Sequence, residues 1–210
     1  PPGFTLPAGT VPPDSLMKSI RDGIQYLEDA TGKRFGNPAN PLLVSVRSGA
    51  RQSMPGMMET VLNVGLNERT ILGLAVGGQD STFAYSSYLR LIRMYAEIVM
   101  GIHIPERLIS KYPRHSVKKV LGYLLHWGIE FPQDPWVQLE NAVRAVYFSW
   151  CTNRAILYRQ EHNIPDDWGT AVNVQAMVFG NMGDTSATGV VFTRNPSTGE
   201  NKVYGEWLPN

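Results

Sequence analysis

The sequence predicts an α+β fold in which strands near both ends of the chain enclose a helical middle. Three observations lead to this prediction. Residues 42–46 form a short apolar run between turn-forming residues, which is typical of an interior strand. Residues 70–112 repeat apolar side chains at helical spacing. Residues 171–179 alternate weakly and are rich in valine, which favours a strand near the end of the chain.

Composition excludes several classes of protein. Of the 210 residues, 43% are hydrophobic and 18% charged, and the net charge is +1, so we expect an ordinary globular chain that binds neither nucleic acid nor an anionic membrane. No apolar run approaches the length of a membrane span, and the single Cys151 excludes an internal disulfide framework. Because the chain begins with Pro1 and not Met, we expect any targeting peptide to be absent or removed.

The first third of the chain is expected to contain one helix and two strands. Asp14 is a plausible N-cap for a helix over residues 15–29, whose leucines and isoleucines recur at helical spacing and which Gly32 closes. The strands are expected over residues 42–46 and 61–66, after a turn-rich beginning.

The remainder is expected to hold helices followed by strands. Helical periodicity dominates the middle of the chain, where prolines interrupt it, and short β-branched runs between turn sequences follow. The expected helices span residues 70–112, 116–127 and 136–161, and the expected strands span 171–179, 189–193 and a segment that begins at 202. This order predicts a helical insert before an antiparallel sheet.

Arg47 directly follows the expected strand at 42–46, and small residues follow Arg47. A guanidinium can hold two phosphate oxygens at once and stays charged at any ordinary pH. Ser48, Gly49, Ser53 and Gly56 would then offer hydroxyls and closely approachable backbone N–H groups. The stretch matches neither the P-loop nor the dinucleotide fingerprint, so it predicts a phosphate site of another kind.

Four blocks carry a resemblance to a known family. They are Pro1-Pro-Gly-Phe-Thr5, the run from Val44-Ser-Val-Arg-Ser-Gly-Ala50 through Ser53-Met-Pro-Gly-Met-Met-Glu-Thr60, residues 169–183, and residues 188–206. Together they closely resemble the nucleotide-binding domain of the pyruvate, phosphate dikinase family. Phosphoenolpyruvate synthases and rifampicin phosphotransferases share the Arg-Ser and Phe-Thr-x-x-Pro elements but lack the Met-Pro-Gly-Met-Met run. Relative to the family, a helix after Phe4 is missing and residues 111–130 are shorter.

The resemblance implies an ATP-grasp-like fold with an inserted helical subdomain. Residues 1–66 plus 133–180 would form the first lobe, residues 67–132 the helical subdomain, and residues 181–210 the truncated start of the second lobe. The nucleotide would lie between the two lobes.

The resemblance also implies an ATP site. Arg47 would contact the phosphates and act in catalysis by neutralising the charge that develops during transfer, and Arg194 could reach the phosphates from the second lobe. A strand behind the adenine would present Gln175, Met177 and Phe179 on one face. The remaining expected ATP contacts are Arg51, Gly56, Met57 and Thr60, and Glu206 is the expected magnesium ligand.

Several of these residues also have simpler interpretations. Arg51 could be a solvated loop arginine, and Met57 with its neighbouring methionines could be flexible core filling. Arg47 could form a surface ion pair, and Thr60 could be an ordinary β-branched strand residue.

The family's enzymes interconvert ATP, phosphate and pyruvate with AMP, pyrophosphate and phosphoenolpyruvate, using Mg²⁺ and a monovalent cation. A phosphohistidine on a separate swivelling domain carries the phosphoryl group, and a separate barrel domain binds pyruvate. The resemblance therefore implies ATP and AMP as ligands, these domains as partners, a homodimer, and a location in the cytoplasm or a eukaryotic organelle rather than secretion. We expect this chain alone to be inactive. The alternatives are a phosphoenolpyruvate synthase or related dikinase, and a non-catalytic nucleotide-binding or interaction module.

Overall fold

The computed structural model describes residues 1–76 and 80–209 and confirms a mixed α+β fold. The chain divides into two compact units, Pro1–Met177 and Val178–Asn210. The expected lobes and helical subdomain differ from this division, because the helices of the middle belong to the same unit as the first strands. Their separation into a subdomain stays a prediction.

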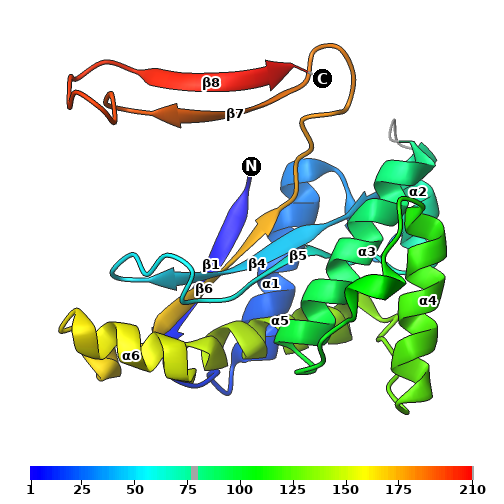
Figure 1. Cartoon of the computed structure of the whole chain (residues 1–210), viewed down its shortest axis with the longest axis horizontal. Helices are drawn as coiled ribbons and strands as arrows, with labels where there is room; N and C mark the ends of the chain where they lie inside the picture. The colour runs from blue at the N-terminus through cyan, green and yellow to red at the C-terminus, as the bar shows by residue number, and fades with distance from the viewer. Residues whose placement is uncertain (77–79, 210) are drawn as a thin grey trace. The chain divides into compact units, whose positions relative to one another are not determined.

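A four-stranded antiparallel sheet forms the centre of the first unit (Figure 1). Its order is β1-β6-β4-β5, so a strand from the end of the unit lies between two strands from its beginning. The strands are β1 (Gly3–Gly9), β4 (Val44–Ala50), β5 (Thr60–Val64) and β6 (Thr170–Ala176), and a separate parallel pair joins β2 (Arg34–Phe35) to β3 (Pro41–Leu42).

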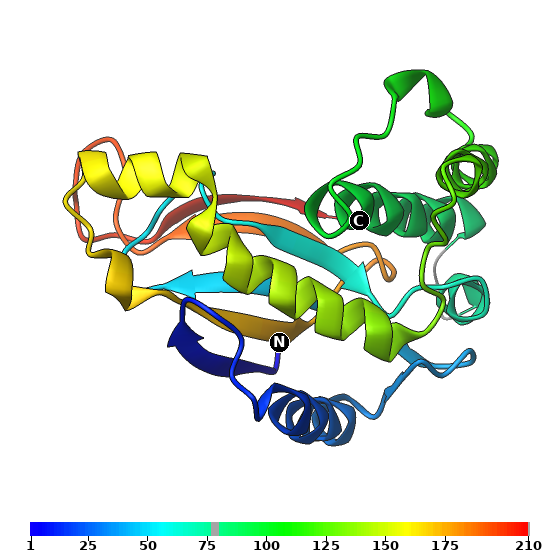
Figure 2. The same cartoon turned by 90° about the horizontal axis from the view of Figure 1, so that it is seen from below.

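Helices cover one face of this sheet. Helix α1 (Leu16–Thr31) packs on β1, and α5 (Pro135–Phe148) crosses β4, β5 and β6 (Figure 2). The covered face is apolar, because Leu6, Val46, Val172 and Val174 are all almost fully buried. This burial supplies the main hydrophobic stabilisation of the sheet.

Helix α1 confirms the expected helix over residues 15–29. It ends at Gly32, whose φ of 68° is left-handed and whose N–H donates to the Glu28 carbonyl, as in a glycine C-cap. The N-cap is Ser15 and not Asp14, and Ser15 makes no side-chain capping hydrogen bond. The first turn of the helix is held instead by burial of Leu16.

Three helices follow β5 on the chain. They are α2 (Thr70–Val76), α3 (Ser81–Ile98) and α4 (Pro113–His126), and residues 77–79 lie outside the described part. The helix expected over 116–127 is confirmed, whereas the helical stretch expected over 70–112 ends at Ile98 and is followed only by a 3₁₀ turn at Glu106–Leu108. Helix α3 contacts β5, α2 and α4. Tyr88 on α3 is buried and bonded to Gln133, and its burial raises the pKa of the phenol to about 12.

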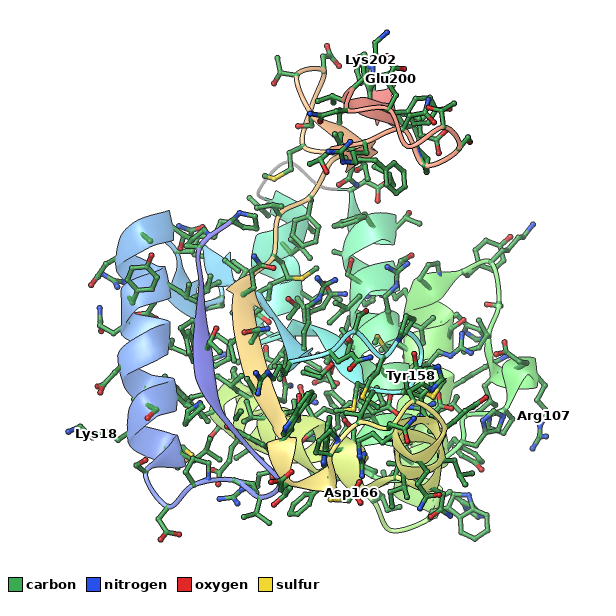
Figure 3. All side chains as sticks on the ribbon, turned by 90° about the vertical axis from the view of Figure 1, so that its left-hand side faces the viewer. Lys18, Arg107, Tyr158, Asp166, Glu200 and Lys202 are labelled. Carbon is green, nitrogen blue, oxygen red and sulfur yellow. The ribbon has the colours of Figure 1, made fainter. Side chains whose placement is uncertain are left out.

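The helix expected over residues 136–161 is interrupted. Helix α5 ends at Phe148, a 3₁₀ turn covers Ser149–Cys151, and α6 spans Asn153–Glu161. The break allows the Trp150 ring to be buried while its indole N–H donates to the Asp166 carbonyl, 3.0 Å away. Figure 3 shows Tyr158 of α6 and Asp166 at this end of the unit.

The loop between β4 and β5 is tied to this same region. Met54 is buried against Trp150, Ala155 and Ile164, and Arg154 on α6 donates to the Met57 carbonyl (3.2 Å). Arg154 also forms an ion pair with Glu59. Packing and polar contacts therefore hold a loop that its sequence alone would leave free.

The second unit contains a hairpin of β7 (Ala187–Phe192) and β8 (Tyr204–Pro209). Glu200 and Lys202 lie in the connection between its strands (Figure 3). The strands expected over 189–193 and from 202 are thus present with shifted ends. Among the described helices of the whole chain, none is both long and apolar enough to cross a membrane.

Gln138 joins the helical part of the first unit to the end of β5. Its side chain is fully buried, accepts from the Gly65 N–H (3.0 Å), and donates to the carbonyls of Leu66 (2.9 Å) and Pro132 (2.8 Å). Gln138→Leu keeps a similar volume but leaves three buried backbone groups without partners. We expect it to lower the free energy of unfolding by about 3 kcal/mol in chemical denaturation.

The matched control is Gln160→Leu, which makes the same change at an exposed position on α6. It should alter the unfolding free energy by less than about 0.5 kcal/mol. Equal effects of the two substitutions would show that the buried hydrogen bonds of Gln138 contribute nothing specific.

Arg154 holds the loop over residues 51–59 through its contacts with Glu59 and the Met57 carbonyl. Arg154→Ala removes an ion pair and a hydrogen bond that hold the loop over residues 51–59, so the loop should open more often. We expect trypsin to cleave after the exposed Arg51 roughly fivefold faster in native conditions. Arg144→Ala, which removes a surface ion pair with Glu140 elsewhere, is the control and should leave that rate unchanged.

Candidate functional site

The face of the sheet opposite α1 and α5 carries polar side chains and is partly open to solvent. On β6 the burial alternates residue by residue: Val172 and Val174 are buried, while Asn173 and Gln175 are half-exposed. Because side chains of a strand point alternately to the two faces, the second pair lies on the side away from these helices. The strand register then assigns Thr5 and Arg47 to that same face, as cross-strand partners of Asn173.

Arg47 lies in the middle of a strand and not at its end. In place of a single strand over 42–46, the structure has β3 (Pro41–Leu42) and β4 (Val44–Ala50), which are separated by Leu43. Ser48, Gly49 and Ala50 pair with β6, so the ladder takes up the small residues that were expected to form an anion-binding loop. The prediction that Ser48 and Gly49 lie in a loop is therefore wrong, and the loop begins at Arg51.

The Arg47 guanidinium is exposed and available. Within the described residues, none forms a hydrogen bond or ion pair with it. Across the ladder it faces Asn173 on β6 and Thr60 on β5, two neutral polar residues. A charged donor fork beside neutral polar groups is suited to binding an anion.

Arg51 is placed differently. Its guanidinium lies over the Trp168 ring, 4.6 Å from the ring centroid, in a cation–π contact. The structure therefore gives Arg51 a local partner, and its expected contact with phosphate stays a prediction.

A shallow hollow of about 400 Å³ surrounds Arg47 on this open face. The Thr5 hydroxyl donates to the Asn173 side-chain oxygen across it, at 2.7 Å. None of the lining residues is a carboxylate; they are Gly3, Phe4, Thr5, Arg47, Ser48, Asn173, Val174 and Gln175. The hollow thus carries one positive charge and hydrogen-bonding groups, which favours an anionic ligand.

Gly56 and Met57 lie in a tight turn of the loop over residues 51–59. The Met57 N–H donates to the Met54 carbonyl (3.1 Å) around Pro55 and Gly56, and Gly56 has a φ of 73°, as a type II turn requires. The side chains of Met54 and Met57 pack in the cluster around Trp150. Core filling therefore accounts for these methionines, and the roles of Gly56 and Met57 toward a nucleotide stay predictions.

The strand expected to lie behind adenine is shorter than predicted. Strand β6 ends at Ala176, and Met177 still donates its N–H to the Leu43 carbonyl (2.8 Å), whereas Phe179 belongs to the second unit. The single face expected for residues 175, 177 and 179 thus does not extend to Phe179. The Gln175 amide donates to the Pro1 carbonyl (3.2 Å), so a polar partner already exists for it.

Arg194 and Glu206 belong to the exposed hairpin. Arg194 donates to the Gly199 carbonyl (3.2 Å) within the β7–β8 connection, and Glu206 lies on β8 opposite Val190. Among the described residues, no three His, Cys, Asp or Glu side chains come together as a metal site would require. The expected role of Glu206 as a magnesium ligand stays a prediction.

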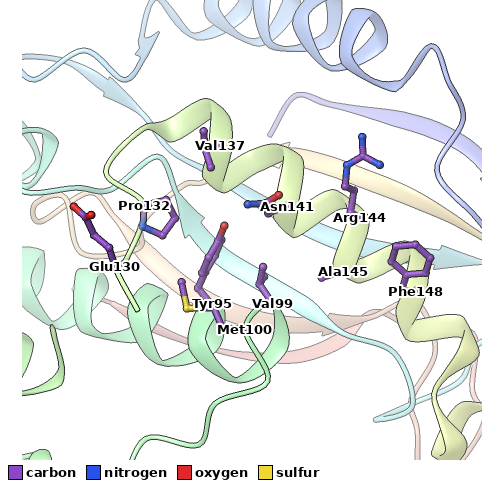
Figure 4. Close-up of a pocket in the computed structure, with 10 residues that line it drawn as sticks. All are labelled: Tyr95, Val99, Met100, Glu130, Pro132, Val137, Asn141, Arg144, Ala145 and Phe148. Atoms are coloured by element: carbon purple, nitrogen blue, oxygen red, sulfur yellow. The ribbon is translucent and has the colours of Figure 1, made fainter. Parts of the chain in front are cut away.

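A larger hollow, of about 520 Å³, lies between α3 and α5 (Figure 4). Its arginine, Arg144, is already paired with Glu140, and Glu130 adds a negative charge to the lining. Tyr95 is almost fully buried there, which raises the pKa of its phenol although the Asn141 amide lowers it. With its only arginine paired, this hollow suits phosphate less well than the smaller one around Arg47.

Sequence reasoning did not single out Thr5 and Asn173, which line the hollow around Arg47. Strand β1 falls in a segment expected to be turn-rich, because Pro7 and two glycines obscure it. Asn173 could have been found, since the alternation that selects Gln175 selects Asn173 as well.

Comparison with known proteins identifies the family. The family model for the pyruvate phosphate dikinase AMP/ATP-binding domain matches residues 9–206. Pyruvate, phosphate dikinase of Rhizobium meliloti is 46% identical over an alignment that covers 100% of this chain and 26% of the relative. The enzyme of Clostridium symbiosum is 49% identical over 93% of this chain, and the enzyme named chloroplastic in Arabidopsis thaliana is 45% identical over 100%.

The matched relatives are much longer than this chain. The chain spans about a quarter of the length of these relatives. The alignment with the Rhizobium protein has 245 positions against 210 residues here, so at least 35 positions have no residue in this chain. Since the family model nonetheless matches nearly the whole chain, the chain belongs to the pyruvate phosphate dikinase AMP/ATP-binding domain family.

Proposed function

We propose that the open face of the sheet binds the phosphates of ATP, with Arg47 as the principal phosphate contact. One observation carries this proposal: Arg47 is exposed at the centre of a polar face and is unpaired among the described residues. Arginines elsewhere in the unit, such as Arg154 and Arg159, are paired with carboxylates. A buried or paired arginine stabilises the fold, whereas an unpaired one is available to a ligand.

The chain would act as the nucleotide-binding part of a longer pyruvate, phosphate dikinase. In that enzyme ATP, phosphate and pyruvate are interconverted with AMP, pyrophosphate and phosphoenolpyruvate through a phosphohistidine on another domain, with a further domain for pyruvate. Arg47 would neutralise charge on the transferring group. The 210 residues would bind nucleotide without completing the reaction, in an enzyme that we expect to be a homodimer.

The finer features of the site belong to the same proposal. The fold would be of the ATP-grasp type, in which Arg51, Gly56, Met57 and Thr60 lie near the phosphates and Gln175, Met177 and Phe179 near the adenine. From the hairpin, Arg194 would add a phosphate contact and Glu206 a single carboxylate toward Mg²⁺. Mg²⁺, when bound with ATP, would offset phosphate charge, and a monovalent cation would act in the full-length enzyme.

The proposal predicts that Mg·ATP binds to the chain and that Arg47→Ala weakens binding by roughly ten- to a hundredfold in isothermal titration calorimetry. That range corresponds to the roughly 1.5–3 kcal/mol of a charge-assisted hydrogen bond. Arg47→Lys should recover only part of the affinity, because an ammonium cannot form the two-point contact of a guanidinium.

Arg144→Ala is the control for this measurement, since Arg144 is an exposed arginine paired with Glu140. It should bind Mg·ATP as the unchanged chain does. Absence of binding by the unchanged chain, or equal binding by Arg47→Ala, would refute the proposed site and favour a non-catalytic interaction module. In the full-length protein, turnover without phosphate as a cosubstrate would favour a phosphoenolpyruvate synthase.

A further inference from the structure

Asn173 on β6 lies on the same face of the sheet as Arg47, between strands β4 and β1. It pairs directly with Arg47 on β4 and with Thr5 on β1. Directly opposed residues in antiparallel strands have β-carbons about 4.5–5.5 Å apart. Asn173 and Arg47 are therefore close enough to bind one ligand together.

The Asn173 amide has a defined orientation. Its oxygen accepts a hydrogen bond from the Thr5 hydroxyl at 2.7 Å, which turns that oxygen toward β1. Its nitrogen lies on the side of β4, because a β-carbon at Gly49 would come within 2.7 Å of it. The hydrogen bond from β1 and the proximity of the nitrogen to Gly49 thus agree that the nitrogen faces the strand of Arg47.

This orientation leaves donors available. No described residue accepts a hydrogen bond from the Asn173 side-chain nitrogen, which carries two N–H donors. The neighbouring Arg47 guanidinium has only donors as well. A ligand that satisfies both must bring acceptor oxygens with negative charge, as a polyphosphate does.

Gly49 makes room for this arrangement. It lies two residues after Arg47 on the same face of β4, where any larger side chain would occupy the place of the Asn173 amide. Glycine at this position therefore leaves the space that the Asn173 amide occupies, and it does not form an anion-binding turn.

We propose that Asn173, oriented by Thr5 and accommodated by Gly49, is a second phosphate-binding residue beside Arg47. The inference rests on the proposed function, because it assumes that the polyphosphate of ATP occupies this face. Asn173 would donate to a phosphate oxygen, while Thr5 and Gly49 act as positioning residues that do not touch the ligand.

Asn173→Asp separates this role from a merely structural one. The change keeps the shape of the side chain and the oxygen that Thr5 bonds, but it replaces the two donors by a second, negatively charged oxygen. That oxygen faces Arg47 and should form a cross-strand ion pair with it, so thermal stability should stay equal or rise. Phosphate binding should fall, because the donors are lost and Arg47 is neutralised.

The test is calorimetric titration of the 210-residue chain with Mg·ATP and, separately, with inorganic tripolyphosphate. We expect Asn173→Asp to weaken both by about tenfold or more without lowering the melting temperature. Thr5→Val and Gly49→Ala should each weaken both by about threefold or more, since they disturb only the position of the amide. Gln160→Glu adds the same charge at an exposed site on α6 and should change neither.

The outcomes distinguish this inference from the proposed function. If the unchanged chain binds neither ligand, or if Arg47→Ala binds as tightly as the unchanged chain, both the proposed function and the inference about Asn173 are overturned. If Arg47→Ala weakens binding but Asn173→Asp does not, Asn173 does not donate to the phosphate, and only the inference is overturned. Loss of ATP binding with tripolyphosphate binding retained would place Asn173 at the sugar or base and would also overturn it.

Discussion

The antiparallel pairing of β6 with β4 is the constraint on which the open face depends. It joins residues 44–50 to residues 170–176, so more than a hundred residues must fold between them. Its register brings Asn173 opposite Arg47 and places Val174 opposite Val46 on the other face. A slip of one residue would turn Arg47 toward α5 and a valine toward solvent, and the apolar face opposes that slip because it is packed by two helices. Burial on one side of the sheet therefore fixes the chemistry of the other.

The polar side chains of the first unit fall into two groups, those that have hydrogen-bond or ring partners within the fold and those that do not. The Gln138 amide bonds three backbone groups, and Arg159 is buried between Asp166 and the Trp150 carbonyl, so both contribute to the fold. Arg51 lies over an aromatic ring. Arg47 and the Asn173 nitrogen differ, because the described residues leave their donors without acceptors. Whether a donor on this face has an acceptor depends on the residues that the fold brings beside it. It therefore cannot be predicted from any single residue of the sequence.

Local signals in the sequence predicted much of this fold. Periodicity placed α1, and the β-branched run placed the core of β4, because each reflects burial on one side of one element. Strand β1 was missed because Pro7 resembles a turn signal, although an edge strand tolerates proline where no ladder hydrogen bond is needed. The continuation of β4 through Ser48–Ala50 was missed for a related reason. Its partner β6 is remote, and only that pairing makes a Ser-Gly-Ala segment a strand.

The hairpin differs from the sheet in how its residues are supported. Strands β7 and β8 are exposed along their whole length, and Val191, Trp207 and Leu208 are each at least 70% exposed. A two-stranded hairpin without a packed face is only marginally stable in water. Arg194 and Glu206 are therefore positioned by a weakly stabilised element, whereas Arg47 and Asn173 are held by a packed four-stranded sheet. Because a binding group contributes most when its position is fixed before the ligand arrives, the phosphate affinity of these 210 residues should come chiefly from the sheet.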